Sequence, residues 1–266
     1  MRRKSRLLTG ALALLAAILV PVIADYTQKP EAIDTVAESV STQAIIESPE
    51  ATPVPEEDPT EGVYTFLQGP KSWGEKRPWS GVWGKTMIDG GSFGGFGFGL
   101  CCMANIYSTI TPYECSPLDM YEYAQKNTDY WSGAIEWGYM EEAMEKLGFT
   151  CELRTKPKSY KEFRNEIESS PAAVLLVSSS EDDSYWQNTP GHYVTSLLYN
   201  RENDMIFLGD SGNPDHNRHW IELKTIYKAL KTASRYQYMT VLAYSEEGNQ
   251  WKKNGIEHKW AGKTEQ

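Results

Sequence analysis

Three residues of this chain occur in an order and spacing that suit nucleophilic chemistry. Cys101 lies just after a glycine-rich loop, His192 opens an apolar run much later in the chain, and Asp210 follows that histidine. A thiol at a helix N-terminus is favoured as the thiolate by the helix dipole. A histidine can accept and return its proton, and a carboxylate can orient the imidazole. This order predicts Cys101 as nucleophile, His192 as base and Asp210 as the orienting acid.

Local signals indicate the elements that would position these side chains. Six of the ten residues in 90–99 are glycine, and the apolar residues that follow predict a helix over 100–110. The runs 192–200 and 205–208 read as two strands, joined by a turn over 200–204. Such a hairpin can bring His192 and Asp210 to adjacent positions.

The remaining elements set the fold class. We expect further helices over 117–126, 132–147, 160–168 and 220–234, and strands over 150–154, 172–178 and 236–244. Ser116-Pro117 is a typical helix start, and Gly148 a typical helix stop. Most helices precede the antiparallel strands, an order that predicts an α+β domain and not a doubly wound sheet.

Three motifs carry a resemblance to a known family. They are the loop and helix GFGLCCMANIYS, the strand GHYVTSLLY and the strand end LGDSGNP. Residues 79–244 resemble the papain-like cysteine peptidases, specifically the bacteriocin-leader (double-glycine) processing peptidases. The resemblance implies a helical N-terminal lobe, an antiparallel-sheet C-terminal lobe and a site in the cleft between them.

The sequence departs from that family where the nucleophile belongs. Family members typically read Gly-Cys-Gly at the helix start, and this alignment places Phe98 at the cysteine position. Ser92 stands where many papain-like enzymes carry an oxyanion-hole glutamine. A shifted register, with the helix starting at Leu100, would make Cys101 its N-terminal residue, and Cys102 is a further candidate. The chain is therefore either a pseudoenzyme or an active enzyme in the shifted register.

Two structural explanations compete with these assignments. Four cysteines could pair as disulfides or lie in the core as small apolar residues: Cys101, Cys102, Cys115 and Cys151. Five polar residues could ligate a metal: Asp210, Asn213, Asp215, His216 and His219. An isolated His-x-x-His pair without a cysteine partner is common by chance, and we expect neither a metal nor another cofactor.

Composition and charge indicate four segments. Residues 1–24 combine a basic start with an apolar run and predict a signal peptide or a single-span N-terminal membrane anchor. Residues 25–62 carry ten acids and five prolines, which predicts a disordered spacer. The peptidase-like domain is expected over 63–245, and residues 246–266 as a frayed or lightly docked tail. With 36 acidic and 26 basic residues, the chain is a poor candidate for binding nucleic acid.

These observations lead to two functional hypotheses for an exported, extracellular or cell-surface protein. In the first, a catalytically degenerate domain binds a peptide or a cell-surface protein in its cleft. In the second, a cysteine peptidase or related amide hydrolase acts through Cys101, His192 and Asp210.

Overall fold

The computed structural model describes residues 58–264. The predicted signal or anchor segment lies outside the described residues, as does nearly all of the predicted spacer. None of the helices within 58–264 combines the length and the apolarity needed to cross a membrane.

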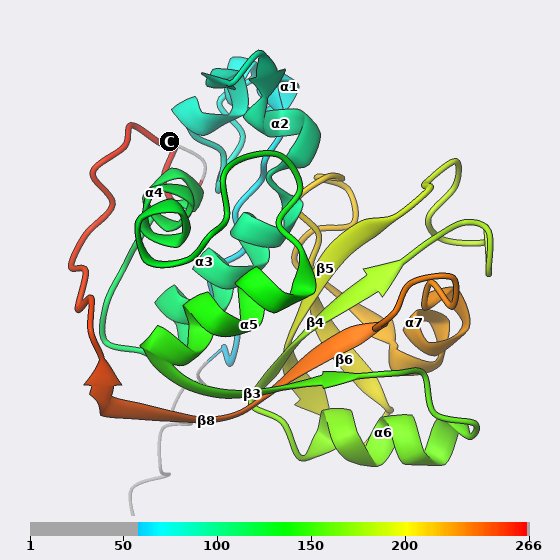
Figure 1. The fold of residues 1–266 in the computed structure, drawn as a ribbon. Coiled ribbons are helices and arrows are strands. Elements are labelled where there is room, and N and C mark those ends of the chain that lie inside the picture. The colour runs from blue at the N-terminus through cyan, green and yellow to red at the C-terminus, as the bar shows by residue number, and fades with distance from the viewer. Residues whose placement is uncertain (1–57, 265–266) are drawn as a thin grey trace, which may run out of the picture. The chain divides into compact units, whose positions relative to one another are not determined.

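Helices dominate the first half of the described chain and strands the second (Figure 1). The helices are α1 (Pro70–Gly74), α2 (Phe93–Phe96), α3 (Phe98–Ile110), α4 (Pro117–Asn127), α5 (Trp137–Lys146), α6 (Tyr160–Glu168) and α7 (Leu223–Ala229), with a 3-10 turn over Val82–Lys85. The strands are β1 (Met87–Ile88), β2 (Gly91–Ser92), β3 (Leu147–Arg154), β4 (Ala172–Val177), β5 (His192–Asn200), β6 (Met205–Gly209), β7 (His219–Glu222) and β8 (Tyr238–Asn249).

Six of these strands form one sheet in the order β3-β8-β4-β5-β6-β7, and every neighbouring pair is antiparallel. The two short strands β1 and β2 form a separate hairpin before α2. Helices first and an antiparallel sheet later confirm the predicted α+β class, with a helical N-terminal lobe and a sheet-based C-terminal lobe.

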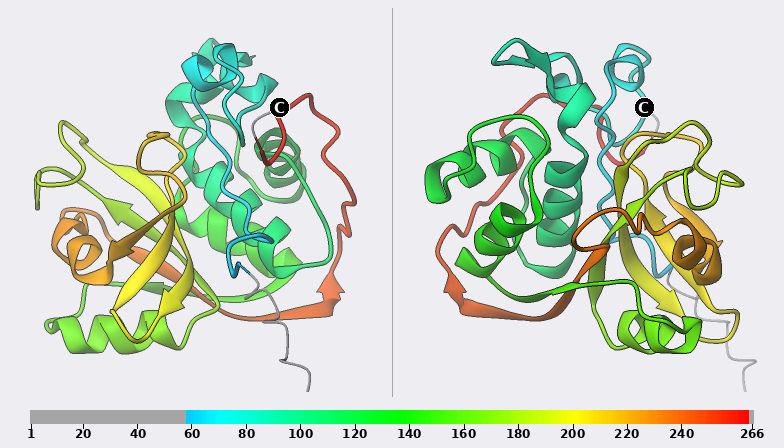
Figure 2. Two further views of the ribbon diagram at one scale, coloured as in Figure 1. Left: turned by 180° about the vertical axis from the view of Figure 1, so that it is seen from behind. Right: turned by 45° about the vertical axis from the view of Figure 1, so that its right-hand side comes forward.

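Helices cover both faces of the six-stranded sheet. Along the buried strand β4, Val174 and Leu176 face one apolar cluster, whereas Leu175 and Val177 face the other. Successive side chains of a strand point to opposite faces, so this alternation means that the sheet separates two cores. Figure 2 shows α3, α4 and α5 on one side of the sheet and α6 and α7 on the other.

Local capping chemistry explains the best-predicted helix. The Ser116 hydroxyl accepts the Asp119 N–H at 3.0 Å, and the Asp119 carboxylate accepts the Ser116 N–H at 2.7 Å. This reciprocal pair is a capping box, and Pro117 at the first helical position lacks the N–H that would otherwise need a partner.

The structure corrects two predicted helices. The helix expected over 132–147 begins only at Trp137, because Gly133 has a φ of +81° that interrupts helical geometry. The helix expected over 220–234 is a short strand, β7, followed by α7. Trp220 pairs with Phe207 across the sheet, with ring centroids 5.5 Å apart, and this packing overrides the helical pattern.

The C-terminal tail, expected to be either frayed or lightly docked, is docked in the structure. Strand β8 continues to Asn249, and the chain after it packs on the helical lobe. Trp260 lies 5.9 Å from the ring of Phe66 and 6.0 Å from that of Trp79, and the Val82 N–H donates to the Lys259 carbonyl. Its lysines suggested a solvated segment, but its tryptophans anchor it to the core.

Candidate functional site

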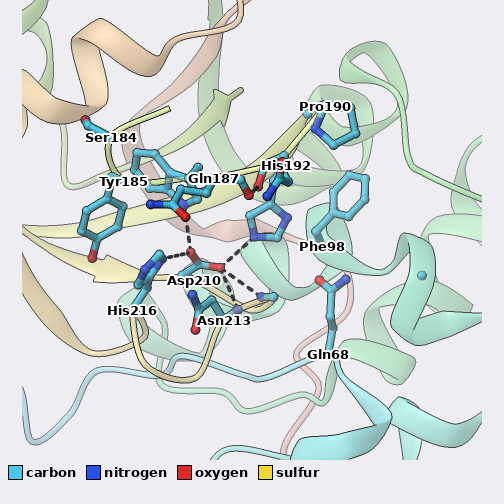
Figure 3. A pocket seen from close by; sticks show the side chains of 16 residues that line it. Gln68, Phe98, Ser184, Tyr185, Gln187, Pro190, His192, Asp210, Asn213 and His216 are labelled. Carbon is cyan, nitrogen blue, oxygen red and sulfur yellow. Dashed lines mark hydrogen bonds and ion pairs between the residues drawn. The ribbon is translucent and has the colours of Figure 1, made fainter. Parts of the chain in front are cut away.

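The hairpin of β5 and β6 brings His192 and Asp210 together. His192 is the first residue of β5, and Asp210 directly follows Gly209, the last residue of β6. The Nε2 atom of His192 lies 2.8 Å from Oδ1 of Asp210 (Figure 3). Both residues are buried, Asp210 almost completely.

Donors from three segments surround the Asp210 carboxylate. Oδ1 also accepts the Gly212 and Asn213 N–H groups at 3.0 and 3.1 Å. Oδ2 accepts the Trp186 indole N–H at 2.9 Å and lies 3.4 Å from His216 Nδ1. Burial alone would raise the pKa of Asp210, but His192, His216 and Trp186 hold it well below its usual range. The carboxylate is therefore charged at neutral pH.

Phe98 occupies the other side of the imidazole. It is the first residue of α3, and its ring packs edge-on against His192, with centroids 5.5 Å apart. The Phe98 ring also packs against the ring of Tyr193, with centroids 5.4 Å apart. Since Nε2 of His192 faces Asp210, the second ring nitrogen, Nδ1, lies on the side of Phe98 (Figure 3). A hydrocarbon ring, with no nucleophilic atom, fills this position.

The structure places the candidate nucleophiles elsewhere. Helix α3 begins at Phe98, two residues before the start that the shifted register requires, so Cys101 lies one turn inside the helix. Cys101 and Cys102 are almost fully buried and are absent from the pocket lining. Burial raises the pKa of Cys102 to about 12 and that of Cys101 well above its ordinary value. Neither thiol is hydrogen-bonded to His192 within the described residues.

All four cysteines are free and buried, including Cys115 and Cys151. The disulfide alternative is therefore not realised in the structure. The thiols serve as small apolar side chains, a common role for buried cysteine.

A pocket of about 650 Å³ opens beside the His192–Asp210 pair. The loop 184–191 forms one wall, and the residues after Asp210 form another (Figure 3). His216 lines this pocket and packs against Tyr185 in a tilted arrangement, with ring centroids 4.1 Å apart. The sequence suggested His216 only as a possible metal ligand.

Gln68 lines the same pocket and was not foreseen. Its Oε1 accepts the Ser211 hydroxyl at 2.7 Å, and its Nε2 donates to the Gly94 carbonyl at 3.0 Å. The Gln68 amide carries two N–H donors, and only one of them donates a hydrogen bond within the described residues. Its second N–H therefore has no partner there. Gln68 lies far upstream of Phe98 in the sequence, and also far from Ser92, the position at which the family resemblance places a glutamine.

Gly212 lies directly against the imidazole ring of His192. A Cβ at Gly212 would lie 3.0 Å from Cε1 and 3.1 Å from Nε2 of His192. We expect Gly212→Ala to displace the imidazole and to lower the free energy of unfolding by about 1–2 kcal/mol, as overpacking does. Chemical denaturation and the NMR signal of His192 measure both effects.

Gly138→Ala is the matched control for this substitution. Gly138 lies in α5 and a Cβ there meets open space, so alanine should stabilise the protein by about 0.5–1 kcal/mol. A Gly212→Ala protein that keeps both wild-type stability and the His192 signal would contradict the proposed crowding.

Neither a protein-family model nor a curated protein matches the sequence. Solved structures with a similar arrangement include the peptidase domain of Streptococcus ComA, described as a bifunctional ABC transporter involved in a quorum-sensing pathway. It is 14% identical over 54% of this chain and 89% of its own, with a TM-score of 0.37. A C39-like peptidase from Bacillus anthracis is 13% identical over 56% of this chain and 90% of its own, with a TM-score of 0.37.

A third similar structure is the N-terminal C39-like peptidase domain of a toxin-secretion ATP-binding protein from Vibrio parahaemolyticus. It is 14% identical over 59% of this chain and 98% of its own, with a TM-score of 0.34. All three sequence identities and TM-scores are low.

Proposed function

We propose that this protein is a catalytically degenerate papain-like domain whose pocket binds a peptide or a surface protein without cleaving it. The observation that carries this proposal is Phe98 at the start of α3, packed against His192. Nucleophilic catalysis needs a reactive atom within hydrogen-bonding reach of the base. The His192–Asp210 pair is present in full, but a phenyl ring stands where that atom would have to be.

The pocket itself supports a binding role. It is large enough for several atoms of a ligand, and its walls combine aromatic and amide side chains, as ligand sites commonly do. Residues 1–24 combine a basic start with an apolar run, which is typical of a signal peptide or membrane anchor. We therefore also propose that the domain acts outside the cytoplasm, at the cell surface or beyond it.

Thiol labelling of the unreduced wild-type protein tests the absence of a nucleophile. We expect iodoacetamide to modify none of the four cysteines selectively between pH 5 and pH 8, because burial keeps all of them protonated. Mass spectrometry of peptide digests would locate any modified residue.

The alternative enzyme makes the opposite prediction. Rapid labelling of Cys101 at low pH that is abolished in His192→Ala would demonstrate an activated thiolate and overturn the proposal. A urea-unfolded sample, in which all four thiols should react, verifies the reagent.

A further inference from the structure

The open nitrogen of His192 is the feature of the pocket that the proposed function leaves unused. Nε2 is held by Asp210, whereas Nδ1 has no hydrogen-bond partner within the described residues. His192 lines the pocket, and Nδ1 lies on its Phe98 side (Figure 3). Because the imidazole is already held in one orientation, its free nitrogen can form a hydrogen bond with a ligand without further rearrangement of the ring.

We propose that the pocket recognises the C-terminal carboxylate of a peptide. In this arrangement Nδ1 of His192 donates a hydrogen bond to the carboxylate. This inference rests on the proposed function, since it names the chemical group of the ligand that the pocket binds. The carboxylate would lie on the pocket side of the imidazole, beside the Phe98 ring and not in its place.

Asp210 fixes the orientation of the imidazole, so that its second nitrogen lies toward the pocket. The charged carboxylate lies 2.8 Å from Nε2. A protonated imidazole carries a hydrogen on Nδ1 as well and can donate it to an anion. Hydrogen bonds between two charged groups are stronger than neutral ones.

The two oxygens of Asp210 accept donors from Gly212, Asn213 and Trp186 besides His192, and the carboxylate lies on the Nε2 side of the ring, away from Nδ1. Other titratable groups around the pair lie on each packed segment: His216 and Tyr185 at the pocket wall, Cys102 in α3, and Lys231 beyond Gly191.

The pocket walls are also suited to a carboxylate. Although the chain has 36 acidic residues, Asp210 is the one acid among the described residues that line this pocket. The free N–H of Gln68 and the side-chain amides of Gln187 and Asn188 offer donors. Phe98 supplies an apolar wall against which the last side chain of the peptide can pack.

The experiment compares N-acetyl-Ala-Ala with N-acetyl-Ala-Ala-amide and with sodium acetate. Each is titrated into the full-length protein carrying ¹³C-labelled histidine, and the four histidine signals are followed by NMR. We expect the acid to shift the His192 signal and to bind about tenfold more tightly than the amide, the gain of one charge-assisted hydrogen bond. Acetate should bind far more weakly than the dipeptide.

Two variants separate a specific effect from a general one. His192→Gln keeps a polar side chain but removes the imidazole, and it should reduce the preference for the acid to less than about threefold, because a neutral amide forms a weaker hydrogen bond with a carboxylate. His219→Gln removes an exposed histidine of β7 outside the pocket and should leave the preference unchanged.

Each contrary outcome overturns a defined statement. Equal binding of acid and amide at His192, or no binding of either, refutes carboxylate recognition, and acetate binding as tightly as the dipeptide refutes recognition of a peptide end. Release of alanine from the acid, or of alaninamide from the amide, would instead refute the proposed absence of catalysis.

Discussion

Phe98→Cys should create a reactive thiolate in one step. The new Sγ would stand at the first residue of α3, beside Nδ1 of a histidine that Asp210 already orients. A neighbouring imidazolium and a helix N-terminus both lower the pKa of a thiol. An ordinary thiol with a pKa near 8.5 is only about 0.3% ionised at pH 6. We expect iodoacetamide to label the introduced thiol about a hundredfold faster than an ordinary exposed thiol at that pH, because its thiolate fraction is correspondingly larger.

Two further variants make this prediction specific. Phe98→Cys combined with His192→Gln should return the labelling rate to that of an ordinary thiol. Phe96→Cys places a thiol in α2, two residues away on a side chain that packs toward Phe93 and Tyr121, and it should label with an ordinary pH profile. Circular dichroism verifies that each variant folds, since loss of the Phe98 ring costs about 2 kcal/mol.

A pH profile of Phe98→Cys with its midpoint above that of an ordinary thiol would contradict a prepared site. In that event the His192–Asp210 pair would be a structural ion pair, and Phe98 would be no more than one core residue among others.

The sequence predicted those elements whose signals are local. The helix after Ser116-Pro117 is fixed by groups within four residues of one another, and the strand runs 172–178 and 192–200 are apolar stretches of strand length. The pairing of β5 with β6 follows from their short turn. Prediction was accurate wherever neighbours in the chain determine the conformation.

It failed where distant packing decides. The run Trp220–Ser234 has a helical pattern, but its first residues complete the edge of the sheet beside β6. The composition of the tail left open whether it is frayed or lightly docked, and Trp260 packs against the aromatic rings of residues 66 and 79. Neither contact has a signal in the local sequence.

The site divides in the same way. His192, Asp210 and Phe98 could be proposed from motifs, because each lies next to a recognisable strand or glycine-rich loop. Gln68 reaches the pocket from a segment that carries no motif, and His216, which follows the LGDSGNP strand end, was considered only as a metal ligand. The start of α3 was placed two residues late, and that small error is what allowed Cys101 to be considered as the helix N-terminal residue.

Asp210→Asn should be among the most destabilising single substitutions in the domain. The carboxylate is 1% exposed and accepts from His192, Gly212, Asn213 and Trp186. An asparagine side chain has one acceptor and one donor end, so in either orientation its NH₂ group faces N–H donors. Removing one partner of a buried ion pair typically costs about 3–5 kcal/mol, and we expect a loss in that range in urea unfolding.

The control is Asp215→Asn, which removes an exposed carboxylate from an ion pair with Arg77. Exposed pairs contribute about 0–1 kcal/mol, so this variant should unfold close to the wild type. If Asp210→Asn does not fold, His192→Gln tests the same pair with a smaller expected loss, because Asp210 keeps its backbone and indole donors.

The pH dependence of stability identifies the charge itself as the cause. The pKa of Asp210 is lowered in the folded state, so its stabilisation is complete above the unfolded-state pKa of about 4 and is lost as the pH falls toward the lower folded value. Between pH 5 and pH 2, the wild type should therefore lose more stability than Asp210→Asn, and the two curves should converge. Parallel curves would mean that Asp210 stabilises the fold through its shape and through neutral hydrogen bonds, and not through its charge.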